Sequence, residues 1–470
     1  MANVATPSEW HTENSPVWAR CRAAIEGGDA VRALGTAIVP AIGGMDRREF
    51  SGYLQRATYM NASQRTLDAL VGLVMQKPAQ YEMPPALEEL ATYIDGRGGR
   101  IEDFARHALA EVLSVGGGLA LVDHPERPDG VVTAAQERAL GLRPLVSWYP
   151  LESVLEYRTG IVNGYEEITW LKLLEHYDEQ IDEWTVDQKK QVRVYCMCEG
   201  RVWARVFRKT ADGQWTLFSE SWPVAHSGQP ITYIPAVFFG PIKNEPGKSP
   251  MLDLIDMNLA HFRNSADHEH VLHFTGLPTP YVAGVSPDDF PSGLKLGSSA
   301  AQVFEDANAK IAFAEISGDS SALATEMLAK EARMAALGAR ALAPEGRQAE
   351  SGDALAIRRG GEHSALAKVA DSVSRSMVLV LETLAEWEGI DGDISYSLNV
   401  DYLPQSVGAQ ELIALMQAWQ GGAISAMELF DLLRKGGVIR DDKEYEEHER
   451  ELSEEAGFLD QPLEGGAFGA

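Results

Sequence analysis

Cysteine, basic residues and long apolar runs are all scarce in this chain of 470 residues. Three cysteines (Cys21, Cys196 and Cys198) exclude a disulfide scaffold and fit a reducing compartment. The longest nearly uncharged apolar stretch, 112–122, contains three glycines and is too short to cross a bilayer. The opening residues lack the basic-then-apolar order of a signal peptide. We therefore expect a soluble protein, cytoplasmic during synthesis, with no membrane partner.

Basic residues are outnumbered by acidic ones. Lysine and arginine total 41 against 69 aspartates and glutamates, which gives a formal net charge of −28. A protein that reads nucleic-acid sequence would show a basic face, so this balance argues against that class. The charge is compatible with a surface along which DNA slides without sticking, and equally with solubility alone.

Complete catalytic or phosphate-binding motifs are also missing. The tripeptide 247–249 (Gly-Lys-Ser) is not a phosphate-binding loop, because Ile242 stands where the first glycine is required. The triple glycine 116–118 lacks the G-x-G-x-x-G spacing and precedes a strand pattern at 119–123. We expect it to form a tight turn.

Metal-binding patterns are incomplete too. Cys196 and Cys198 alternate with Val192 and Val194 as in a strand, so we expect an apolar sheet face that lacks the remaining zinc ligands. The order His-Glu-His at 268–270 is not H-E-x-x-H, because Leu272 occupies the second histidine position. Four histidines are expected on the surface near a helix end: His261, His268, His270 and His273. We expect no metal and no cofactor.

Apolar periodicity predicts helices at 47–75 and 101–115. Residues 144–240 read as β-rich, with a three-stranded meander over 191–218 and turns at 199–200 and 211–213. A further strand is expected at 394–402. From residue 409 a separate helical unit follows, with a dense acidic run near the C-terminus.

The most informative stretch runs from 250 to 361. It reads as a helix over 251–274, a Gly/Pro-rich insertion with short strands at 280–285 and 302–304, and an Ala-rich helix over 320–342. A polar break at 343–352 precedes a third helix that ends at Trp387. The first helix has a narrow apolar stripe: Met251, Ile255, Leu259, Phe262 and Ala266.

Polar residues flank this stripe on both sides, so we expect the helix to face neighbours and solvent by turns. The layout suits an elongated subunit that packs beside copies of itself.

Several segments, in this order along the chain, resemble a family of tailed-bacteriophage portal proteins. The first group is YLQRA at 53–57, RTLDALVG at 65–72 and KP at 77–78. The second group is IP at 234–235, MLDLIDMN at 251–258 and SAD at 265–267. The third group is GGAIS at 421–425 and LRKGG at 433–437. The match spans nearly the whole chain, and its specificity lies in the order of the segments.

The resemblance implies an α+β portal fold with a mixed α/β wing, long stem helices, a small α/β clip insertion and a C-terminal helical crown. Carried onto this sequence, it assigns these parts: wing 1–248, stem helix 249–275, clip 276–318, second stem helix 319–342, tunnel loop 343–352, wing helix and strand 353–408, and crown with acidic tail 409–470.

The resemblance also implies a non-enzymatic ring, usually a dodecamer, at one capsid vertex of the virion, assembled in the host cytoplasm. Such a ring is a conduit for genome packaging and ejection, and double-stranded DNA passes through it without base-specific contacts. Its other partners are the terminase large subunit, an adaptor or neck protein, and the major capsid protein. Twelve copies at −28 each would carry −336 formal charges, which would keep DNA mobile in the channel.

Two groups of site residues follow from the resemblance. The channel and tunnel loop would present Arg340, Glu345, Arg347, Glu350, Arg358 and Arg359. The clip would dock the motor and neck through Lys295, Glu305, Asp306 and Lys310.

Two alternatives stay open. The chain could be another ring-forming virion adaptor that is not the DNA gate. It could also be an acidic hydrolase that uses paired carboxylates, with the pairs Asp253/Asp256 and Asp441/Asp442 as candidates. Both pairs fall on expected solvent faces, which argues against the hydrolase.

Overall fold

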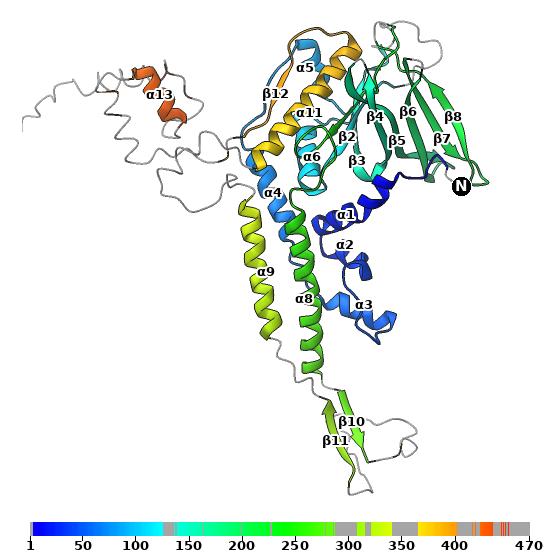
Figure 1. Cartoon of the computed structure of the whole chain (residues 1–470), viewed down its shortest axis with the longest axis vertical. Coiled ribbons are helices and arrows are strands. Elements are labelled where there is room, and N and C mark those ends of the chain that lie inside the picture. The colour runs from blue at the N-terminus through cyan, green and yellow to red at the C-terminus, as the bar shows by residue number, and fades with distance from the viewer. Residues whose placement is uncertain are drawn as a thin grey trace, which may run out of the picture. The chain divides into compact units, whose positions relative to one another are not determined.

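The structure is a computed structural model, and it divides the chain into two compact units, Met1–Val400 and Asp401–Ala470. The residues that it describes are 3–125, 136, 139–162, 164–198, 200–225, 228–277, 279–284, 286, 308–314, 321–340, 365–400, 402, 416, 419, 424–435, 443, 445, 447 and 450. The first unit contains both helices and antiparallel sheets (Figure 1), so the α+β class predicted from the sequence is confirmed.

The N-terminal part of the first unit is mostly helical. Its helices are α1 (Glu9–Glu26), α2 (Gly28–Ala33), α3 (Arg47–Arg56), α4 (Ala62–Val74), α5 (Pro85–Ala91) and α6 (Ile101–Ser114), with a 3-10 turn η1 at Gly35–Ala37. Ser8 caps α1, because its hydroxyl accepts a hydrogen bond from the His11 N–H at 3.3 Å. The helix predicted at 101–115 is confirmed as α6.

The helix predicted over 47–75 is interrupted, so that prediction is wrong about its continuity. Ala57 has an extended backbone (ψ 133°) and ends α3. The N–H of Thr58 donates to Ser265 Oγ at 2.9 Å, on the long helix α8 (Leu252–Gly276). Asn61 then caps α4 through a bond from the Gln64 N–H. The break is stabilised by a hydrogen bond to a helix that is distant in sequence, and the periodicity of the local sequence does not predict such a bond.

Two antiparallel sheets follow. The smaller has the order β3-β2-β9, with β2 at Gly118–Asp123, β3 at Leu145–Pro150 and β9 at Ala236–Phe239. The larger has the order β4-β5-β6-β7-β8, and the 3-10 turn η2 (Leu151–Ser153) leads into it. Its strands are β4 (Val154–Val162), β5 (Tyr165–Gln180), β6 (Val186–Cys198), β7 (Arg201–Lys209) and β8 (Trp215–Ser221). The predicted meander is therefore confirmed as β6, β7 and β8.

The triple glycine is a tight turn, as predicted. Gly116 and Gly117 have φ values of 101° and 143°, which residues other than glycine rarely adopt. A Cβ on Gly116 would lie 2.1 Å from the carbonyl oxygen of Gly247. The backbone of residues 240–249 therefore packs directly on this turn. Ser249 closes the contact by donating its hydroxyl to the Leu113 carbonyl at 2.7 Å, which is a structural role.

The face of β6 that carries Cys196 and Cys198 is apolar for most of its length, as predicted. Val192, Val194 and Cys196 are buried, whereas Cys198 is exposed. Residues Val4 and Ala5 near the N-terminus pack against this cluster. In the described part of the chain, no group of three or more His, Cys, Asp or Glu side chains could hold a metal ion.

Helix α11 (Ala365–Glu388) contributes much of the core of the first unit, and its apolar side contacts α5, α6, β2 and β9. It ends one residue after the predicted Trp387, which is 3% exposed. Of the strand predicted at 394–402, only β12 (Ser395–Ser397) is formed, and it pairs with β1 (Gln80–Glu82). The predicted strand was therefore too long.

The second unit contains helix α13 (Ala426–Lys435), in agreement with the predicted helical unit. Ser425 and Glu428 cap each other, because the Glu428 N–H donates to Ser425 Oγ and the Ser425 N–H donates to Glu428 Oε2. Most of the acidic run lies outside the described residues.

Candidate functional site: a long helix pair and its β ribbon

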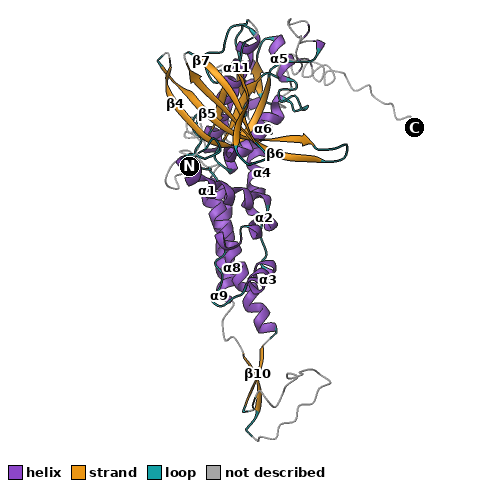
Figure 2. Cartoon of the chain, turned by 90° about the vertical axis from the view of Figure 1, so that its right-hand side faces the viewer, coloured by secondary structure: helices purple, strands orange, loops and turns teal. Residues whose placement is uncertain are grey.

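The stretch that the sequence singled out folds as two long helices that lie side by side. Helix α8 has 25 residues and α9 (Ser321–Arg340) has 20, so they are about 37 and 30 Å long. Both views show them adjacent, with the ribbon of β10 (Thr279–Ala283) and β11 (Lys310–Ala314) beyond one end of the pair (Figures 1 and 2). The helix–insertion–helix layout predicted from the sequence is therefore present.

The apolar stripe predicted on α8 is buried along its whole length. Its five members are at most 4% exposed: Met251, Ile255, Leu259, Phe262 and Ala266. They face α1, α3, α4 and α9, all of which contact α8. One face of α8 is thus committed to the core of its own subunit.

Some polar residues of α8 are buried as well, which corrects the expectation that they face neighbours and solvent. Asn258 is fully buried (0% exposed), and its Oδ1 accepts hydrogen bonds from the N–H groups of Ala62 and Ser63 at 3.0 and 3.1 Å. Its Nδ2 donates to the Met60 carbonyl at 2.9 Å. One side chain of α8 therefore binds the first amides of α4 and fixes where that helix starts.

His261 is also buried, so the expectation of four surface histidines is wrong for it. It is 3% exposed, and its Nε2 lies 3.2 Å from Glu331 Oε1 on α9. His270 is partly buried between the rings of Tyr53 and Phe274. Burial first, and then the nearby Arg56 and His273 charges, lower the pKa of His270. His261 links the two long helices instead of facing solvent.

Helix α9 presents two different faces. Met334 is 2% exposed and packs inward, whereas Leu328 on another face is 65% exposed. Ala332 and Ala335, one and two turns further along, are exposed beside it. Thr325 lies on the same face, so apart from Leu328 the exposed side chains there are small, and no described part of the subunit covers them.

The ribbon β10–β11 is a two-stranded antiparallel pair with apolar side chains in solvent. Tyr281, Ile311 and Phe313 are 51%, 38% and 54% exposed. Two strands alone cannot bury such side chains, and isolated ribbons are marginally stable. The strand predicted at 280–285 is confirmed within two residues at each end, and the one predicted at 302–304 lies outside the described residues.

Few of the predicted site residues fall in the described part of the chain. Lys310 begins β11, opposite Ala283, and is exposed. Arg340 is the last residue of α9. The others lie outside the described residues: Lys295, Glu305, Asp306, Glu345, Arg347, Glu350, Arg358 and Arg359. The structure therefore neither brings these groups together nor separates them.

Of the first carboxylate pair considered for a hydrolase, one side chain is in an ion pair and the other is exposed to solvent. Asp256 forms an ion pair with Arg20 at 3.0 Å, and Asp253 is exposed. Asp441 and Asp442 lie outside the described residues.

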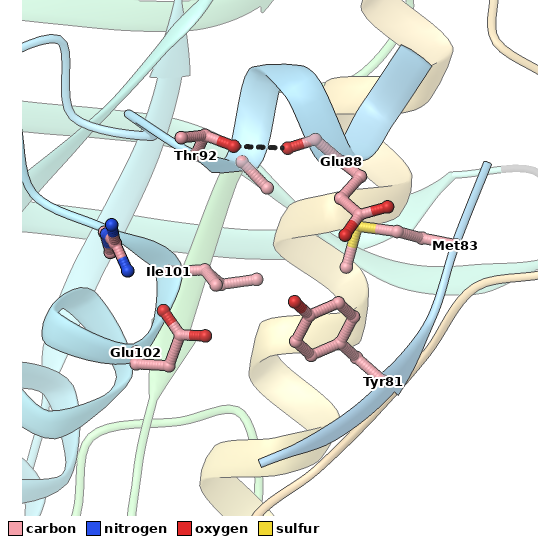
Figure 3. A pocket seen from close by; sticks show the side chains of 8 residues that line it. Tyr81, Met83, Glu88, Thr92, Ile101 and Glu102 are labelled. Atoms are coloured by element: carbon pink, nitrogen blue, oxygen red, sulfur yellow. Dashed lines mark hydrogen bonds between the residues drawn. The ribbon is translucent and has the colours of Figure 1, made fainter. Parts of the chain in front are cut away.

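One hollow of about 240 Å³ lies between β1, α5 and α6 (Figure 3). Tyr81, Met83 and Ile101 give it an apolar lining, and the carboxylates of Glu88 and Glu102 come from different sides of it. Thr92 and Arg100 complete the polar part of the lining. No described helix is long and apolar enough to span a membrane.

A family model matches part of the chain that includes this region. Residues 250–388, from the start of α8 to the end of α11, match the family model "Domain of unknown function (DUF4055)". No curated protein matches the chain.

Solved structures with a similar chain come from gene transfer agent (GTA) particles. The neck of a native GTA particle computed with C12 symmetry is 14% identical in sequence and has a TM-score of 0.37. The match covers 85% of this chain and 98% of that chain. The virion of a native GTA particle matches with 13% identity, 87% and 98% coverage, and a TM-score of 0.38. The neck of an empty GTA particle with C6 symmetry matches with 14% identity, 84% and 95% coverage, and a TM-score of 0.37.

These neighbours are particle necks and a virion.

Proposed function

We propose that the chain is a portal-type subunit: copies close head to tail into a ring at one vertex of a virus-like capsid, and the genome passes through the central opening. The uncovered face of α9 is the observation that supports this most. Burying Leu328, at 65% exposure in the single chain, against a neighbour would remove apolar surface from water. A ring joins two different surfaces of each subunit, so in this proposal the exposed face of α9 meets another surface of the neighbouring copy.

The remaining assignments are part of the same proposal. The helix pair would be the stem, residues 276–318 with the β10–β11 ribbon would be the clip, and residues 343–352 would be a tunnel loop. Lys310 would help to dock the terminase or the neck protein, and Arg340 would make transient phosphate contacts. The net charge of −28 per copy supports a conduit that does not retain DNA.

Substitution of Leu328 tests the ring. Leu328→Glu should abolish rings in native mass spectra and negative-stain images, because a carboxylate would be desolvated at the interface. Leu140→Glu is the matched control. Leu140 is 57% exposed and precedes β3 instead of lying on α9, so its substitution should leave rings intact. Wild-type protein that stays monomeric at all concentrations, or rings in the Leu328 variant, would contradict the proposal.

Substitution of Lys310 separates the portal from another ring-forming adaptor. Lys310→Glu should leave ring mass unchanged and reduce genome packaging, because it reverses an exposed charge on the proposed docking surface. Normal packaging with intact rings would favour the adaptor.

A further inference from the structure

The hairpin of β5 and β6 projects beyond the rest of its sheet. The pairing of β4 with β5 ends at Leu173, and that of β7 with β6 ends at Gln191. Residues 176–190 beyond these points pair only with each other among the described strands. Figure 2 shows this hairpin extending sideways past the other strands. We call residues 175–190 the arm.

The base of the arm is held rigidly by a polar network. Glu175 accepts hydrogen bonds from Tyr149 at 2.6 Å, from Gln191 at 2.7 Å and from Arg193 at 2.7 Å. Burial, and then the charge of Glu175, raise the pKa of Tyr149 well above its ordinary value, so its hydroxyl stays a donor. The Arg208 guanidinium covers the Tyr177 ring at 4.0 Å. An arm fixed at its base points in a defined direction.

The tip of the arm is a preorganised turn that presents a tryptophan. The Ile181 N–H donates to the Thr185 carbonyl at 2.9 Å. Asp182 Oδ1 accepts from the N–H groups of Trp184 and Thr185 at 2.8 Å each. Trp184 is 87% exposed, and Ile181 and Val186 beside it are 55% and 51% exposed. Rigid exposed aromatic side chains are typical anchors of protein interfaces, because little entropy is lost when they dock.

Charge limits what the tip can bind. Residues 178–190 contain five carboxylates and two lysines, and one of these, Lys189, pairs with Glu179 within the arm. Nucleic acid and anionic lipid would be repelled. Two such arms facing each other would repel in the same way. Charge complementarity favours a surface with lysine or arginine.

We propose that the arm docks a different protein, inserting Trp184 into an apolar notch that is bordered by lysine or arginine side chains. Trp184, Ile181 and Val186 would supply the buried centre of the contact. Asp178, Glu183 and Asp187 would form a charged rim that orients the partner and accelerates association. The inference does not depend on the ring, because the arm lies on the sheet and not on the helix pair.

Site-specific photo-crosslinking in the full chain tests this. Trp184→p-benzoylphenylalanine, made in cells that assemble the native particle, should give one covalent adduct with another protein on irradiation. The crosslinked peptide should carry apolar residues next to lysine or arginine. The same replacement at Ile161, which is 75% exposed near the end of β4 and opposite Glu166 of β5, is the matched control and should give no such adduct.

A charge-neutralised arm completes the test. Asp178→Asn, Glu183→Gln and Asp187→Asn together should lower the adduct yield about fivefold or more, because the rim charges are lost. Neutralising Glu82, Glu88 and Glu89 instead should leave the yield unchanged. An adduct with a second copy of this chain or with nucleic acid, or a yield no higher than at Ile161, would overturn the proposal. Ring mass measured on the same samples reports separately on the proposed function.

Discussion

Single buried polar side chains decide how α8 is seated in the subunit. Asn258 satisfies two amide donors at the start of α4 and one carbonyl before it. If the side chain were shortened, the Ser63 N–H would lose this acceptor, whereas the Ala62 N–H and the Met60 carbonyl would keep their own bond of 2.8 Å. Leaving buried backbone groups unpaired costs more than the net value of the hydrogen bonds themselves.

We therefore expect Asn258→Ala to lower the free energy of unfolding by about 2 to 3 kcal/mol, measured by urea denaturation. Asn264→Ala, on a partly exposed position of the same helix, should change it by less than about 0.5 kcal/mol. Equal effects of the two substitutions would mean that the bonds to α4 contribute little.

A second buried group is the ion pair of Lys172 and Glu156 on the five-stranded sheet. Lys172 is 7% exposed, lies 2.8 Å from Glu156 Oε2 and also donates to the Thr6 carbonyl. Burial alone would raise the pKa of Glu156, but hydrogen bonds from Lys172 and then Arg158 outweigh it and lower this pKa below its ordinary 4.5. The carboxylate form is therefore stabilised by folding.

Glu156→Gln should reduce the free energy of unfolding by about 3 kcal/mol at pH 7, because it leaves a buried ammonium without its carboxylate. The lowered pKa makes this contribution present above the unfolded value of about 4.5 and lost as the pH falls through the folded value. The difference between variant and wild type should thus shrink in urea melts below pH 4.5. Glu220→Gln, which removes the exposed pair with Arg205, should cost less than about 1 kcal/mol at any pH.

At the scale of elements, the β10–β11 ribbon cannot be stable by itself. It has only two strands, and its aromatic side chains are exposed to solvent. The hydrogen bonds between the two strands should therefore open readily in the monomer. Residues 310–314 should exchange hydrogen fast in the Leu328→Glu protein and more slowly in wild-type assemblies, as measured by mass spectrometry. Equal exchange in both would show that assembly does not cover the ribbon.

At the scale of the whole molecule, net charge opposes assembly. Chains at −28 each repel one another, and salt screens that repulsion with a Debye length of about 10 Å at 0.1 M and 3 Å at 1 M. If apolar contacts along α9 hold the assembly, the assembled fraction at fixed protein concentration should rise between low and moderate salt. Light scattering or native mass spectrometry would measure it, and a fall with salt would indicate an interface dominated by ion pairs.

The sequence by itself determined the features that depend on local pattern. The apolar stripe of α8, helix α6, the β6–β8 meander and the glycine turn follow from spacing and from backbone chemistry, which a short window contains. The resemblance to portal proteins added an ordered layout for the rest. Of its site residues, Lys310 and the backbone of Arg340 lie in the described part.

Only the tertiary structure decided which polar residues are inside and which strands stand alone. The break at Ala57, the burial of Asn258 and His261, and the projection of the arm all depend on partners far away in the chain. An asparagine flanked by apolar residues looks the same whether it meets water or the open amides of another helix. Its burial is set by the hydrogen bonds that the distant segment offers, and these exist only once the chain has folded.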